Sequence, residues 1–451
     1  MSDDQHIWKL SIGHNWKYCI CLAFLIGIVP VCQGQINAKA VESKWVENTT
    51  ISVQFHDDYP VFAAGAPLVF QCKFVSKSSQ PIAGLLHCAI QQFSGENFIS
   101  KSQKIYIDHY GKVDKTIQFA AVSQGFYRVY LRLTDDTGQQ ISQTYGFAVA
   151  PEQVIGKGNV PEDFDAFWSL TLDKLKQVPL NFTRTKNASL SKENIEVYDV
   201  SIQSYDGRYI KGFYALPKGK NRLPAILRFP DFVGAGTPDF LQYPKCAQFF
   251  LLPETPIDGS DNARKKVPAS VSKGIASKEK YIYRGIYMDG IRCLDFLCAQ
   301  AEVDTSHIAV MGHGQGGALC ISTAALDPRI KLCLPDAISL ADIQDRVLLN
   351  AWPTQSVEVL LNQEQFSTER LFETLSYFDP QSFAPKVNCP ILLGMGMLDA
   401  DCPPLTQFAV FNKIQSVSKA YLLYPAPGSA WTGVQAMRRG EWLETYFFAK
   451  K

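Results

Sequence analysis

Between residues 36 and 150, apolar residues tend to recur at every second position. From Tyr127 to Leu133 they alternate with polar residues, the turn-forming stretch Asp135–Gly138 follows, and a second alternating run covers Tyr145–Val149. This order predicts a β-hairpin. Similar short runs occupy Pro67–Phe74, Leu85–Phe93 and Lys104–Ile107. We therefore predict an immunoglobulin-like β-sandwich of about seven strands over residues 36–150.

The pattern changes after residues 151–160, a stretch with two glycines that we interpret as a linker. Apolar residues then recur at helical spacing, at Phe164, Phe167, Trp168, Leu172 and Leu175. Strand patterns follow at Glu196–Gln203, Tyr209–Leu216 and Leu223–Phe229, and strands and helices alternate to the C-terminus. This alternation is typical of a parallel sheet covered by helices on both faces. Residues 151–451 are therefore predicted to form a second domain of the α/β class.

One stretch of this second domain predicts a specific local structure. The apolar residues Ile308–Met311 indicate a buried strand, a glycine-rich turn follows, and a run of small residues with helical character ends at Leu326. Strand, tight turn and helix together form the context of a nucleophile elbow, in which a strained central residue presents its side chain above the sheet. Gly312 and Gly316 occupy the two flanking glycine positions, but the central residue is Gly314, which has no nucleophilic atom.

Several spaced motifs resemble one family. The elbow GHGQGG followed by ALDPRI is similar to the Gly-x-Ser-Gln-Gly-Gly elbow of the acetyl xylan esterase and cephalosporin C deacetylase family. The resemblance extends over roughly residues 158–448 and is also carried by PEDFDAFW (161–168), YIYRGIYMDGIRCLDFL (281–297) and CPILLGMGMLDADCPP (389–404). It implies an α/β-hydrolase fold, and an ester hydrolase that acts through a serine, an acid and a histidine in that chain order.

The three catalytic positions are only partly filled. Asp399 matches the acid position, Gly314 the nucleophile position and Ser429 the histidine position. No histidine occurs anywhere from Gly314 to Lys451, so no other register of the loop can supply one. A serine hydroxyl is hardly basic near neutral pH and cannot replace histidine as the general base. The loss of a triad costs about a million-fold in serine enzymes, so we predict a degenerate member that is inactive as a serine esterase.

No residue around the elbow is expected to replace the missing groups. By the resemblance, Gln315 supplies one backbone N–H to the oxyanion hole, and the loop that contains Asp231 supplies the other. Asp231 would place a negative charge where a negative oxyanion has to form, which opposes acyl transfer. His313 is interpreted as structural, because the residue before the elbow's centre generally points away from the pocket mouth.

Near the N-terminus, an apolar run from Tyr18 to Val31 is too short to span a bilayer comfortably but suits the core of a signal peptide. We predict a signal peptide over residues 1–34 and export to the periplasm, the cell surface or the medium. A membrane anchor and a lipid-modified Cys32 are the alternatives. Cys72 and Cys88 could then form a bridge between neighbouring strands, while most other cysteines are interpreted as buried thiols.

The composition limits the ligands. The formal net charge is +1 and no block of basic residues is present, so binding to nucleic acid is not expected. No cysteine or histidine spacing indicates a metal site, and no cofactor is expected. The sequence thus predicts a secreted acetyl xylan esterase-like protein that binds acetylated polysaccharide or oligosaccharide without catalysis, or that assembles as a homo-oligomer or with an active paralogue. The alternative is an active esterase that deacetylates xylan-type sugars by an unrecognised set of residues.

Overall fold

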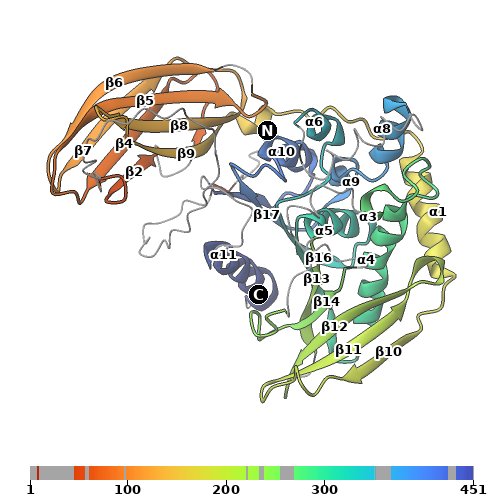
Figure 1. Ribbon diagram of the computed structural model, residues 1–451. Coiled ribbons are helices and arrows are strands. Elements are labelled where there is room, and N and C mark those ends of the chain that lie inside the picture. The colour runs from red at the N-terminus through yellow and green to blue at the C-terminus, as the bar shows by residue number, and fades with distance from the viewer. Residues whose placement is uncertain are drawn as a thin grey trace, which may run out of the picture.

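The computed structural model describes residues 8–9, 45–55, 60–95, 98–219, 222–232, 238–253, 269–349, 351, 367–424 and 433–449. These residues form two domains, an N-terminal all-β domain and a larger α/β domain (Figure 1).

The N-terminal domain is a sandwich of a three-stranded sheet, β2-β4-β7, and a five-stranded sheet, β3-β9-β8-β5-β6. Its strands are β2 (Thr49–Gln54), β3 (Val61–Phe62), β4 (Leu68–Ser76), β5 (Ile82–Gln92), β6 (Ile99–Ile107), β7 (Lys112–Phe119), β8 (Gly125–Asp135) and β9 (Gln140–Val149). The predicted hairpin is β8–β9, whose pairing runs from Gly125 opposite Val149 to Thr134 opposite Gln140. Side chains of both sheets meet in one apolar core, in which Tyr127 stacks on Phe147 with ring centroids 5.3 Å apart.

Cys72 and Cys88 both lie in this core, on β4 and β5 of the two different sheets. Both thiols are free, so the predicted bridge between them is not formed. Burial raises the pKa of each thiol to about 12, which keeps both protonated and unreactive. They act as small apolar side chains within the sandwich core.

The α/β domain is built on a ten-stranded sheet of order β1-β18-β17-β16-β15-β13-β14-β12-β11-β10. Its strands are β1 (Trp8–Lys9), β10 (Phe182–Lys186), β11 (Ile195–Gln203), β12 (Tyr209–Pro217), β13 (Leu223–Phe229), β14 (Ala247–Leu251), β15 (Val303–His313), β16 (Ile330–Asp336), β17 (Ile391–Gly396) and β18 (Lys419–Tyr424). Neighbours from β14 to β18 pair in parallel, whereas β10, β11 and β12 pair antiparallel. The carboxyl ends of β13 and β15 to β18 therefore share one edge, where a site can form.

Helices cover both faces of this sheet (Figure 1). They are α1 (Phe164–Lys176), α3 (Ala269–Ser272), α4 (Ile282–Cys298), α5 (Gln315–Leu326), α6 (Ile343–Leu348), α8 (Thr368–Ser376), α9 (Pro380–Phe383), α10 (Pro404–Lys413) and α11 (Gly433–Leu443), with single helical turns at Pro151–Gln153, Tyr205–Gly207 and Ala384–Lys386 and a π-turn at Glu444–Phe448. Within β15, Val310 faces the main core, while Ala309 and Met311 face the smaller core beneath α11. Burial on both sides explains the continuous apolar run in the sequence.

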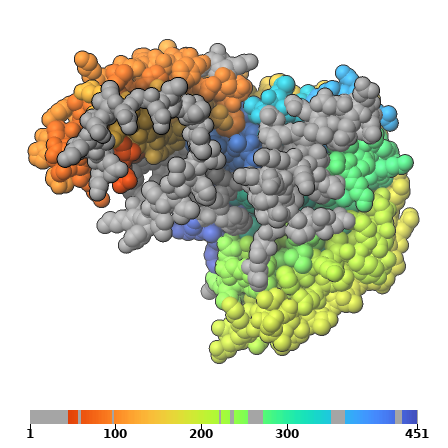
Figure 2. Space-filling view, viewed as in Figure 1, coloured from red at the N-terminus to blue at the C-terminus, as the bar shows by residue number. Residues whose placement is uncertain are grey.

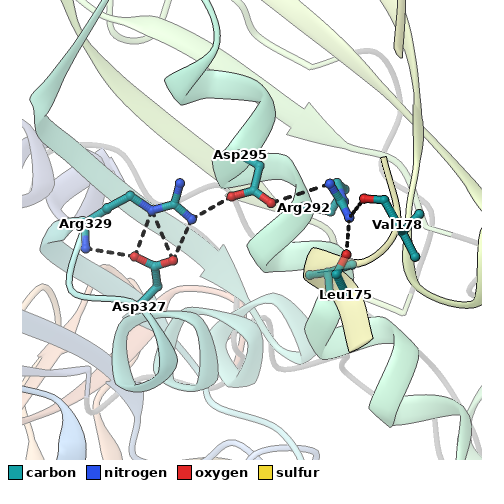
Figure 3. Close-up of polar contacts among 6 residues, drawn as sticks. All are labelled: Leu175, Val178, Arg292, Asp295, Asp327 and Arg329. Carbon is teal, nitrogen blue, oxygen red and sulfur yellow. Dashed lines mark hydrogen bonds and ion pairs between the residues drawn. The ribbon is translucent and has the colours of Figure 1, made fainter. Parts of the chain in front are cut away.

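A chain of ion pairs fixes α4 against its neighbours (Figure 3). Arg292 on α4 donates to the carbonyl oxygen of Leu175, in the last turn of α1, at 2.8 Å and to that of Val178, just after α1, at 3.0 Å. One turn along α4, Asp295 accepts from the guanidinium of Arg329 at 2.7 Å, and that guanidinium also pairs with Asp327. Because Asp327 directly follows α5, these contacts tie the helix behind the elbow to α4 and α1.

The sandwich packs against one end of the α/β domain, beside α10 and β17 (Figures 1 and 2). Phe126 of β8 contacts Phe408 of α10, with ring centroids 5.2 Å apart, and belongs to the main core of the α/β domain. Gly146 of β9 faces Met397, directly after β17, so closely that a β-carbon there would lie 2.4 Å from the Met397 β-carbon. The two domains therefore share a tightly packed interface.

Apart from β1, the predicted signal peptide lies outside the described residues. Within the described part of the chain, no helix combines the length and the apolar character needed to cross a bilayer.

We expect Gly146→Ala to lower the free energy of unfolding by about 1–3 kcal/mol, because the added methyl would overlap both the side chain and the backbone of Met397. Urea unfolding of the full chain measures this. Gly440→Ala on α11 is the matched control: nothing lies within 4 Å of its β-carbon position, and alanine favours a helix. Equal stability of the Gly146→Ala variant and the parent would contradict the described domain interface.

Candidate functional site

The turn between β15 and α5 has the geometry of a nucleophile elbow. Gly314 adopts φ 58° and ψ −116°, which a residue with a side chain adopts only under strain. A β-carbon on Gly312 would lie 2.4 Å from the carbonyl oxygen of Gly316, and one on Gly316 would lie 2.6 Å from that of Phe229. Both flanking glycines are thus required by close backbone packing, while the strained central position carries no hydroxyl.

The space above Gly314 is occupied by another side chain. A β-carbon built on Gly314 would lie 2.1 Å from Oδ1, 2.5 Å from Cγ and 2.8 Å from Oδ2 of Asp231. Asp231 lies two residues after β13, the strand next to β15 in the sheet. Its carboxylate therefore stands where the side chain of an elbow nucleophile would be.

The same carboxylate binds the two backbone donors at the elbow. Its Oδ1 accepts from the N–H of Gln315 at 3.0 Å and from the N–H of Phe232 at 2.8 Å. One of these donors follows the elbow's centre and the other comes from the loop after β13, which are the two places where an oxyanion hole takes its donors. Both donors at these two places therefore point to one carboxylate oxygen of the protein itself.

His313, the last residue of β15, lies among carboxylates. Its Nδ1 lies 3.0 Å from Oδ2 of Asp336, a buried residue at the end of β16. Burial by itself lowers the pKa of His313, but the hydrogen bond and charge of Asp336, helped by Asp231 and Asp399, raise that pKa above its ordinary value. The guanidinium of Arg439 lies 3.7 Å from the same Asp336 oxygen. The hydrogen bond between His313 and Asp336 holds the His313 ring against β16.

Asp399, at the predicted acid position, is buried in the loop after β17. Its Oδ1 accepts from the N–H of Asp401 at 2.9 Å and of Cys402 at 2.8 Å. Its Oδ2 is buried and has no hydrogen-bond partner among the described residues. Burial raises the pKa of Asp399 to about 6, although the N–H of Cys402 and the charge of His313 oppose this. The predicted histidine position, Ser429, lies outside the described residues.

Other nucleophilic and aromatic side chains of the α/β domain belong to its core. Cys320 and Ser322 on α5 are fully buried, and Tyr377 and Phe378 pack with Trp168 in the main core rather than line a pocket. No three His, Cys, Asp or Glu side chains come close enough together to bind a metal ion in the described part of the chain.

Two pockets flank the Asp231 loop. One of about 540 Å³ is lined by Phe232, Gln315 and Leu319, among others. The second, of about 480 Å³, is lined by Asp231 and His313, among others. Both include Pro230 and residues 251–253, so the two pockets adjoin, and Gln315 and His313 place one on each side of the elbow.

Two participants were not identified from the sequence. The N–H of Phe232 carries no sequence signal of its own, because any residue other than proline provides such a donor. Asp336 could have been found, since it ends an apolar strand and the carboxyl ends of parallel strands meet at one edge.

The mostly parallel sheet with helices on both faces, together with this strained turn between strand and helix, defines an α/β-hydrolase. More narrowly, the chain belongs to the acetyl xylan esterase family, because the family model for acetyl xylan esterase (AXE1) matches residues 152–445. The residues that match the family model thus lie in the α/β domain, and the sandwich precedes them in the chain.

Individual relatives agree with this assignment. The acetyl esterase Axe7A of Xylanibacter ruminicola is 28% identical over 319 residues, which cover 67% of this chain and 70% of the relative. The acetyl xylan esterase structure from Paenibacillus sp. R4 matches with a TM-score of 0.61 and 29% identity over 66% of this chain and 98% of the relative. Acetyl xylan esterase 1 from Thermoanaerobacterium sp. JW/SL YS485 has the same fold, with a TM-score of 0.60 and 24% identity over 66% and 98% of the two chains.

The overlap at the elbow predicts strong coupling between two substitutions. Gly314→Ala should be costly in the parent protein, because its methyl would collide with Asp231 and its backbone would be strained. In an Asp231→Ala background only the backbone strain remains. The loss in free energy of unfolding caused by Gly314→Ala should therefore be smaller there by about 1 kcal/mol or more. Urea unfolding of the four proteins in this double-mutant cycle measures the coupling. Asp231→Asn is the control that keeps the volume and should give no relief; additive costs in the Asp231→Ala cycle would contradict the placement of Asp231.

Burial of Asp399 predicts a pH-dependent effect. A pKa of about 6 in the folded protein, above the value of about 3.9 in an unfolded chain, means that this group favours folding below about pH 4 and that the benefit is lost as the pH rises through 6. Asp399→Asn replaces the ionisable carboxyl by an amide and so removes this loss of stability at higher pH. Its stability relative to the parent should therefore improve between pH 4 and pH 8 by on the order of 2 kcal/mol.

Urea unfolding at several pH values tests this expectation. Asp401→Asn, in the same loop, is the control for the change in net charge. A stability difference between Asp399→Asn and the parent that stays constant from pH 4 to pH 8 would contradict the burial of an ionised Asp399.

Proposed function

We propose that this member of the acetyl xylan esterase family does not hydrolyse esters and instead binds carbohydrate. The observation that carries the proposal is the carboxylate of Asp231, which occupies both the nucleophile's space above Gly314 and the oxyanion hole. Acyl transfer needs a nucleophile, a base and free donors for the developing negative charge. Here the nucleophile is absent, the donors are engaged, and the chain order offers no histidine after the acid.

The pockets favour binding over a purely structural role in assembly. Two adjoining pockets of about 540 and 480 Å³ remain open beside the elbow, each within the size range of small-molecule sites. A scaffold retained only for assembly would not need to keep them. Because the relatives are named acetyl esterases and acetyl xylan esterases, we propose oligosaccharides of the xylan type as the ligands.

We further propose that the protein is exported, on the strength of the apolar segment from Tyr18 to Val31. Polysaccharides are found outside the cell, so export and carbohydrate binding are consistent with each other. The alternative of an active esterase gains no specific support from the geometry.

A direct assay for esterase activity tests the proposal. Purified protein should not turn over an activated acetate ester faster than a Gly314→Ala control, and a fluorophosphonate probe should not label it. Labelling of any serine that is abolished by mutation of that serine would contradict the proposal.

A reconstruction variant tests the cause of inactivity. Gly314→Ser alone should restore nothing, since its side chain would meet Asp231 and its hydroxyl would have no base. Combined with Asp231→Gly and Ser429→His, and with Asp399 as the orienting acid, the same substitution should give weak hydrolysis that is lost on Asp399→Asn. Substantial activity of Gly314→Ser alone would show that another base is present.

A further inference from the structure

The two oxygens of Asp231 are in different situations. Oδ1 accepts from the N–H groups of Phe232 and Gln315, which fixes the carboxylate in one orientation. No hydrogen bond among the described residues uses Oδ2, and Asp231 is partly exposed and lines a pocket. A carboxylate oxygen has two lone pairs and only accepts hydrogen bonds when ionised. Asp231 therefore presents a fixed acceptor at the elbow, where an active esterase presents donors.

The rest of the wall suits a neutral, partly apolar ligand. Phe232, Ile286 and Leu319 give the larger pocket apolar surface. Its carboxylate, Asp289, is already paired with Arg208, whose Nη2 lies 3.0 and 2.9 Å from the two carboxylate oxygens. Lys211 adds a positive charge to this pocket, and Arg228 adds one to the second pocket, which contains the carboxylates of Asp231 and Asp239. The walls are therefore not uniformly negative and do not specifically favour a cation.

A fixed acceptor at this point distinguishes a sugar with a free hydroxyl from its acetylated form. An acetyl ester replaces a hydroxyl, which can donate, by a carbonyl, which only accepts. The carbonyl would face Oδ2 of Asp231, which only accepts, and the two elbow N–H groups are already engaged and offer it no hydrogen bond. A free hydroxyl can donate to Oδ2, and a hydrogen bond to a charged acceptor is among the stronger ones.

We propose, on the basis of the carbohydrate-binding function proposed above, that the site selects sugars with free hydroxyl groups over their acetylated forms. Asp231 is the residue that determines this selection. The protein thus recognises a deacetylated oligosaccharide, the product of the reaction for which its fold is built. Some other enzyme, a carbohydrate deacetylase, would have to supply this ligand.

The test compares one oligosaccharide in two forms. Binding of xylohexaose and of O-acetylated xylohexaose to the full chain is measured by titration calorimetry. We expect the free sugar to bind about tenfold or more tightly than the acetylated one. Asp231→Asn keeps an oxygen for the two N–H groups but replaces the acceptor Oδ2 by an amide donor. It should weaken binding of the free sugar and remove or reverse the preference.

Asp173→Asn is the matched control, because it removes one carboxylate from the exposed face of α1 and should keep the parent's preference. Thermal unfolding shows that each variant is folded. Equal or tighter binding of the acetylated form by the parent, or an unchanged preference in Asp231→Asn, would overturn the inference and leave carbohydrate binding intact. Binding of neither form would instead contradict the carbohydrate-binding function itself.

Discussion

The interaction between Asp231 and the two N–H groups at the elbow determines what this site can do. In an α/β-hydrolase these donors are held ready for the negative oxygen of a tetrahedral intermediate, and their value lies in being unoccupied before the reaction. Here they bind the carboxylate of Asp231, an anion that is covalently part of the protein and therefore always present. A side chain at position 314 and the carboxylate of Asp231 exclude each other, since the two cannot occupy the same space.

Positively charged groups nearby offset part of the negative charge that Asp231 adds to the elbow. Asp231, Asp336 and Asp399 all act on His313, and together they raise its pKa despite its burial. A histidine that is protonated more readily offsets part of the negative charge that three carboxylates bring to the sheet edge. Arg439, buried beside Asp336, does the same from α11. In an active triad the histidine has to accept a proton from the nucleophile, whereas His313 is held against Asp336 and serves the charge balance.

The sequence predicts the fold well where the signal is local. The alternation before Val149 predicts the hairpin β8–β9, and Gly312 and Gly316 predict the elbow, because these patterns depend on neighbouring residues only. Strand β10 escapes prediction because its exposed edge position gives no alternation of buried side chains. The placement of Asp231 could not be derived locally: it is 84 positions from Gln315, and only the pairing of β13 with β15 brings the two together. The charge of Asp231 was visible in the sequence, but its occupation of the nucleophile's space was not.

The presence of Asp399 in this loop also has a structural explanation. Its Oδ1 binds the N–H groups of Asp401 and Cys402 and so shapes the turn that leads into α10. Met397, two residues before it, is pressed against Gly146 of the sandwich, and Phe408 of α10 packs on Phe126. Loss of the carboxylate would leave two backbone donors of this turn without their acceptor, and the turn supports the interface between the domains. A side-chain oxygen at this position therefore supports the turn even when it does no chemistry, and the presence of Asp399 alone is no evidence of an esterase.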